Sequence, residues 1–194
     1  GRIDNALLEK YQYEGHGFAW FETYRISLRE TLNWYKSLKD ANKSSKLESG
    51  ILIFAFSEYL TQMRNGIMMS QTEVVRPSIL GISQESFSFY ESPDVANLIK
   101  IGSSDSVKDE IVSSLENGIF PNLGLNDETL EMIQDQFKKF SEEQVIPNAH
   151  EWHLKDELIP MSVIDKMSEL GIFGLTIPEE YGGLGMSKLA MCIV

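Results

Sequence analysis

The sequence predicts an all-α fold, in which a helical extension is followed by the start of a second helical domain. Three observations predict it. Apolar residues recur at helical spacing in several long segments, strand-like alternation is weak everywhere, and proline, serine and glycine stand where the periodic segments begin and end. Hydrophobic residues make up 42% of the 194 residues and charged residues 24%, a balance that is typical of chains with a buried core.

The N-terminal segment predicts two helices that are separated by glycines. Residues 5–13 form a short helical pattern, which Gly15 and Gly17 are expected to end. Residues 18–38 predict an amphipathic helix, because aromatic and leucine side chains recur along one face. That face carries Phe21, Tyr24, Leu28, Leu32 and Tyr35.

A third helix is predicted over residues 47–65, buried nearly all round and ending at Gly66. A buried strand is the alternative for its densest apolar part, residues 51–56, but the helical spacing continues beyond that part. Residues 67–84 then predict a connector, in which Val74 and Val75 extend briefly.

Two more helices are predicted after the connector. Pro93 suits a first helical position and Ser92 suits the N-cap before it. The second helix is expected over residues 107–117, with Gly118 as its stop. Its inward-facing residues are expected to be Ile111, Val112 and Leu115.

A domain boundary is predicted at residues 120–124, because a proline and a glycine punctuate this segment. We therefore expect an extension over residues 1–122 and a second helical domain over residues 126–194. The chain stops inside the apolar run 191–194, so we expect the sequence to be the front part of a longer protein.

The second domain is expected to begin with a helix that Asn126 or Asp127 caps and Pro147 ends. Its apolar face would carry Leu130, Ile133, Phe137 and Phe140. Residues 161–170 predict the next helix, and Ser187 is expected to cap a further one. Between them lies a tight loop, residues 176–185, which three glycines and one proline punctuate.

Charge and cysteine content restrict the possible functions. The formal net charge is −12, so binding to nucleic acid or to an anionic membrane surface is not expected. The longest apolar run, residues 50–56, is far shorter than the about 20 residues that span a bilayer. Cys192 is the single cysteine, so no intrachain disulfide forms, and a reducing compartment such as the cytoplasm is expected.

Two polar groupings could carry chemistry, but surface roles explain them better. His150 and His153 are three residues apart, yet no third metal ligand is apparent, so no metal site is predicted. Glu58, Glu73 and Arg76 could form a polar site in the extension, and solvated surface charges are the favoured alternative.

The second domain resembles the N-terminal helical domain of the acyl-CoA dehydrogenases. The matching residues are the segment 146–149, Glu151, the segment 170–175 and the loop 177–185. The sequence of residues 149–160, which follows a long helical extension, resembles the methylsuccinyl-CoA dehydrogenase subfamily most. One departure is His153, where many relatives carry an acidic residue, so no role is transferred to it.

The resemblance implies an FAD-dependent enzyme that oxidises the α and β carbons of a short branched acyl-CoA. It also implies electron-transfer flavoprotein as the electron acceptor and a homo-oligomer for the full-length protein. In the family this loop approaches the acyl cavity, so Tyr181, Gly182 and Gly183 are candidates for lining a substrate pocket. A tight turn that packs helices together is the structural alternative.

No catalytic or flavin-binding residue can be assigned in this chain, because the family places them beyond the helices present here. We therefore expect the 194-residue chain alone to be inactive. A non-catalytic helical interaction module is the alternative function.

Overall fold

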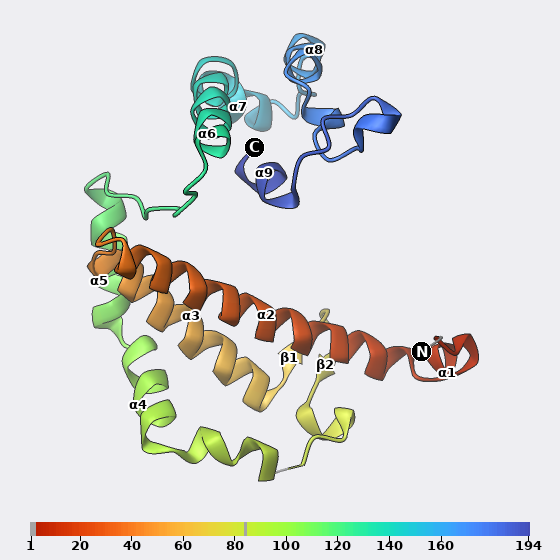
Figure 1. Ribbon diagram of the computed structural model, residues 1–194, viewed down its shortest axis with the longest axis vertical. Helices are drawn as coiled ribbons and strands as arrows, with labels where there is room; N and C mark the ends of the chain where they lie inside the picture. Colours follow the sequence, from red (N-terminus) through yellow and green to blue (C-terminus); the bar gives the residue numbers. More distant parts are fainter. Residues whose placement is uncertain (1–2, 84) are drawn as a thin grey trace. The chain divides into compact units, whose positions relative to one another are not determined.

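The computed structural model describes residues 3–83 and 85–194 and divides the chain into two compact units (Figure 1). The first unit spans residues 1–124 and the second spans residues 125–194. Both are mainly α-helical in their described residues, as the sequence predicts. Residue 84, which ends the predicted connector, lies outside the described residues, as do residues 1 and 2.

Helix α2 (Gln12–Asp40) runs through both Gly15 and Gly17, so the prediction that these glycines separate two helices is wrong. The short helix α1 (Asn5–Lys10) ends before them. Gly17 is buried, and a Cβ atom there would lie only 2.4 Å from Cγ2 of Val75. This glycine therefore permits a close approach to the helix instead of ending it.

Helix α3 (Lys46–Asn65) confirms the helix predicted over residues 47–65, and the strand alternative is wrong. Ser45 and Glu48 form a capping box, because the side chain of each residue accepts a hydrogen bond from the backbone N–H of the other. The helix lies beside α2 (Figure 1), where Tyr24 stacks on Tyr59 with ring centroids 4.4 Å apart.

A small antiparallel ribbon follows α3. Strands β1 (Ile67–Met68) and β2 (Val74–Val75) pair with Ile67 opposite Val75, which confirms the predicted extension at Val74–Val75. The side chains of Ile67 and Val75 are fully buried and form a core cluster with Phe21. Two 3₁₀ turns come next, at Pro77–Leu80 and Glu85–Glu91.

Helices α4 (Pro93–Gly102) and α5 (Asp105–Glu116) both pack on α3. Ser92 caps α4 as predicted, by accepting a hydrogen bond from the N–H of Val95. In α5, Val112 and Leu115 are exposed, so the prediction that they face inward is wrong. The reason is that α5 packs mainly on α3 and covers only a narrow, half-buried stripe, which includes Ile111 beside Gly50.

The segment after α5 is held against α2 and α3 at Asn122. Its N–H donates to Oε1 of Glu48 at 2.8 Å, and its carbonyl accepts from Nε1 of Trp34 at 2.9 Å. Its side-chain oxygen also accepts from the N–H of Gly124. The predicted boundary segment 120–124 is therefore anchored by hydrogen bonds at its centre.

The second unit begins with α6 (Glu128–Phe140), which Asp127 caps as predicted. A π-helical turn, Ser141–Val145, leads directly into α7 (Ile146–Leu154). The prediction that Pro147 ends a helix is wrong, because Pro147 stands in the first turn of α7. The wider π turn accommodates a residue that cannot donate a backbone hydrogen bond.

Two further helices complete the second unit, α8 (Met161–Glu169) and α9 (Lys188–Ile193). Ser187 caps α9 as predicted. Helix α6 packs against α9, and the core cluster of this unit contains Leu130, Leu175 and Ala190.

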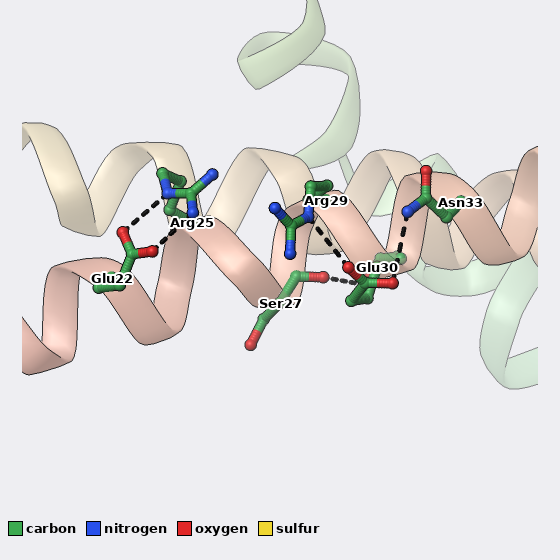
Figure 2. Close-up of polar contacts among 7 residues, drawn as sticks. Glu22, Arg25, Ser27, Arg29, Glu30 and Asn33 are labelled. Atoms are coloured by element: carbon green, nitrogen blue, oxygen red, sulfur yellow. Dashed lines mark hydrogen bonds and ion pairs between the residues drawn. The ribbon is translucent and has the colours of Figure 1, made fainter. Parts of the chain in front are cut away.

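The exposed face of α2 carries local pairs of opposite charge (Figure 2). Arg25 donates two hydrogen bonds to Glu22, which lower the pKa of that carboxyl, and Arg29 donates to Glu30. Such solvated pairs contribute little to stability. Within the described ranges, no helix has both the length and the apolarity needed to cross a bilayer.

Candidate functional site

The glycine-rich loop 176–185 folds back on the residues that precede it. Three backbone hydrogen bonds hold the returning segment in place, at 2.9, 2.8 and 2.8 Å. They run from the N–H groups of Leu184, Gly185 and Met186 to the carbonyls of Gly174, Ile177 and Leu175, respectively.

The three predicted pocket residues lie together in this loop, but in different environments. The side chain of Tyr181 is 76% exposed. Gly182 has a φ of 82°, with no atom within 4 Å of where a Cβ would be. A Cβ on Gly183 would lie 2.1 Å from the carbonyl oxygen of Ile177. Gly183 thus packs within the loop, whereas Tyr181 faces solvent.

Replacing Gly183 by alanine is expected to destabilise the second unit by about 2 kcal/mol, because its Cβ would overlap a backbone oxygen. That oxygen, on Ile177, already accepts the hydrogen bond from Gly185 and cannot move without breaking it. Thermal unfolding and hydrogen exchange of the loop in the full-length protein measure the effect.

Gly182→Ala is the matched control. Its positive φ costs about 1 kcal/mol in strain, but the added methyl group meets open space. Equal losses for the two variants would contradict the packing role of Gly183.

A mainly apolar cavity of about 730 Å³ lies among α6, α7, α8 and α9. Phe137, Phe140, Trp152, Val163 and Met191 are among its lining residues. Its size lies within the range of about 300–1,000 Å³ that is usual for small-molecule sites. The loop residues 181–183 do not line it.

The polar lining of this cavity comes from Ser141, His153 and Glu157. A flavin ring presents several nitrogen and oxygen atoms that need hydrogen-bond partners when buried, so this lining fits it poorly. We assign no flavin-binding residue to the cavity. In the part of the chain that the structure describes, no three histidine, cysteine or acidic side chains gather to hold a metal ion.

The contribution of α7 to the cavity was missed from the sequence. Ala149 and Trp152 of α7 line it together with Val145, the residue just before the helix, and their spacing of four and three residues is helical. This signal was present, but Pro147 suggested that the helix ended there. The face of α6 that carries Phe137 and Phe140 was predicted correctly.

Comparison with known proteins identifies the second unit. Residues 127–194 match the family described as acyl-CoA dehydrogenase, N-terminal domain. By this match, the second unit belongs to the N-terminal domain family of the acyl-CoA dehydrogenases, and its helices α6 to α9 lie within the matched region.

One relative matches the whole chain, including the first unit. The chain is 41% identical over its full length to (2S)-methylsuccinyl-CoA dehydrogenase of Cereibacter sphaeroides, and covers 35% of that protein. Glutaryl-CoA dehydrogenase of Desulfococcus multivorans is 39% identical over 34% of the chain. Benzylmalonyl-CoA dehydrogenase of Aromatoleum aromaticum is 35% identical over 31% of it. The chain covers 17% and 16% of these last two relatives.

These comparisons confirm the predicted family and support the dehydrogenase assignment over a separate interaction module. The limits of the two domains, 1–122 and 126–194, stay predictions. The pocket roles of Tyr181, Gly182 and Gly183 also stay predictions.

Proposed function

We propose that this chain is the N-terminal part of an FAD-dependent acyl-CoA dehydrogenase that oxidises a short branched acyl-CoA resembling methylsuccinyl-CoA. The observation that carries the proposal is the match with a methylsuccinyl-CoA dehydrogenase, which includes the extension as well as the family domain. The other two relatives match about a third of the chain, so they support the reaction class and not the extension.

In this proposal, a carboxylate would remove the α-proton of the thioester, and a bound FAD would supply the oxidising capacity that the reaction needs. Neither group is assigned to a residue of this chain. The second unit supplies helical packing around the apolar cavity. The loop with Tyr181, Gly182 and Gly183, which does not line that cavity, contributes a separate part of the acyl pocket in this proposal. Apolar walls support the chemistry, because excluding water strengthens the hydrogen bonds that polarise the thioester carbonyl.

The partners in the proposal follow from the family. They are the acyl-CoA substrate, electron-transfer flavoprotein as electron acceptor, and further copies of the same chain in a homo-oligomer. The proposed compartment is the cytoplasm, because the single cysteine Cys192 indicates no need for disulfides. The net charge of −12 supports a protein that binds neither nucleic acid nor an anionic membrane.

The test compares the full-length protein with the 194-residue chain. The full-length protein is expected to show flavin absorbance and to oxidise methylsuccinyl-CoA in a dye-coupled assay, faster than it oxidises unbranched butyryl-CoA. The 194-residue chain is expected to show neither the absorbance nor the oxidation. A flavin-free full-length protein, or rapid oxidation by the short chain, would overturn the proposal.

A further inference from the structure

A second cavity, of about 610 Å³, lies in the first unit, beside the end of α3 and the two 3₁₀ turns that follow β2. Its volume falls within the range of about 300–1,000 Å³ that suits a small organic ligand. The family domain covers residues 127–194 only, so this cavity belongs to the extension.

Two arginines, Arg64 and Arg76, line this cavity, in a chain whose net charge is −12. Glu91 supplies the single carboxylate among the lining residues, and its Oε1 pairs with the guanidinium of Arg64. Across the described residues, Arg76 has no ion pair and no side-chain hydrogen bond. A guanidinium presents a planar fork of donors, which matches phosphate and carboxylate oxygens.

The other walls of the cavity combine hydroxyl groups with an aromatic ring. Ser78, Ser83 and Ser88 are among the lining residues, and the hydroxyl of Ser83 is hydrogen-bonded to that of Ser86. Phe87 packs nearly parallel to Tyr90, with ring centroids 5.3 Å apart and an angle of 8° between the planes. Tyr90 is 2% exposed and is therefore fixed, so it holds the Phe87 ring in position on the cavity wall.

This combination favours an anionic group that is joined to a planar or apolar part. A cation is disfavoured by the two arginines, and a purely apolar ligand would cover the Arg76 guanidinium without giving it a partner. An organic phosphate places its dianion against the arginines and its planar or apolar part against Phe87. Each guanidinium-phosphate contact is a charge-assisted hydrogen bond, which is stronger than a neutral one.

We propose that this cavity of the extension binds a small organic phosphate of about mononucleotide size. Arg76 contacts the phosphate, and Phe87 packs on the organic part. Arg64 contacts both the phosphate and the carboxylate of Glu91. Glu58 and Glu73 do not line the cavity, so of the three residues considered as a polar site from the sequence only Arg76 takes part. The proposal does not depend on the dehydrogenase activity.

Isothermal titration calorimetry of the full-length protein with AMP tests the proposal, with adenosine and inorganic phosphate as partial ligands. AMP is expected to bind at least about tenfold more tightly than either part alone, because both the guanidinium and the ring contribute. Arg76→Ala is expected to weaken AMP binding about tenfold or more, and Arg76→Lys to restore part of it. Glu91→Gln is expected to tighten binding, because it releases Arg64 from its carboxylate partner.

Arg29→Ala is the matched control, since Arg29 is an exposed arginine on α2 that does not line the cavity. It is expected to leave AMP binding unchanged. Thermal unfolding checks that each variant keeps its fold, as expected for exposed side chains. AMP binding that is unchanged in Arg76→Ala and in Glu91→Gln would overturn the proposal, as would equal affinities for AMP and inorganic phosphate.

Discussion

Replacing Glu48 by alanine is expected to destabilise the first unit by about 3 kcal/mol, because the change leaves several donors without an acceptor. Glu48 is buried, with only 3% of its surface exposed. Its Oε2 accepts from the N–H of Ser45 at 2.7 Å and from the hydroxyl of the same residue. Its Oε1 accepts from the N–H of Asn122 at 2.8 Å. Denaturant unfolding of the full-length protein measures the loss.

The same change is expected to loosen the segment 120–124. Asn122 would keep the bond from Trp34 but lose the one to Glu48. Hydrogen exchange should therefore rise at the Asn122 amide and at the first turn of α3 together. Ser45→Ala, which removes only the hydroxyl of the cap, should raise exchange in α3 and not at Asn122. Glu116→Ala, an exposed glutamate of α5, is the control that should change neither.

The Glu48 carboxylate also predicts a dependence of stability on pH. Burial raises the pKa of Glu48, but the hydrogen bonds from Ser45 and Asn122 outweigh burial and leave the pKa below its ordinary value of 4.5. A carboxyl whose pKa is lower in the folded state stabilises the fold above its unfolded pKa. That contribution is lost as the pH falls below 4.5 through the lowered pKa. In Glu48→Gln this part of the acid dependence should disappear, and an unchanged acid profile would contradict the role of the ionised group.

Gly102→Ala is expected to destabilise the contact between α3 and α4 by about 3 kcal/mol, at the upper end of the usual cost of overpacking. A Cβ atom there would lie 2.5 Å from the carbonyl oxygen of Ile53 and 2.5 Å from Cβ of Ser57. Ser57 cannot move aside freely, because it is 1% exposed and its hydroxyl donates to the carbonyl of Ile99 at 2.8 Å. The added methyl group must therefore push the two helices apart.

Gly15→Ala is the matched control for this prediction, since Gly15 is also a helical glycine. Its added Cβ would meet only Cδ1 of Leu8, at an ordinary 3.7 Å. Alanine should stabilise α2 by about 0.5–1 kcal/mol, because it restricts the unfolded chain more than glycine does. Thermal unfolding of both variants in the full-length protein gives the comparison. A Gly102→Ala protein as stable as the parent would show that α4 is not packed tightly on α3.

The helical class and most helix ends could be predicted from local sequence signals. Ser45, Ser92, Asp127 and Ser187 act as N-caps in the structure, and Ser92, Asp127 and Ser187 were predicted as caps. Such signals can be read locally, because a cap satisfies backbone N–H groups only two or three residues away. The family resemblance could also be recognised from the sequence, because the matching segments occur in the order and spacing that are typical of the family.

Tertiary structure decided what glycine and proline do at each position. Gly15 and Gly17 weaken a helix by propensity, yet α2 runs through them because Val75 packs against the buried Gly17. Pro147 stands in the first turn of α7, where the π turn before the helix accommodates its missing backbone N–H. At the two glycines, packing from elsewhere in the unit outweighs a local preference of about 1 kcal/mol per glycine.

The two cavities also differ in how far the sequence predicts the residues that line them. Helical spacing identified the α6 wall of the apolar cavity, whereas the cavity around Arg64 and Arg76 could not be found from the sequence. These two arginines are twelve residues apart and meet only because β1 and β2 turn the chain back on itself. Periodicity reports which face of an element is apolar, and it carries no information on which side chains a turn brings together.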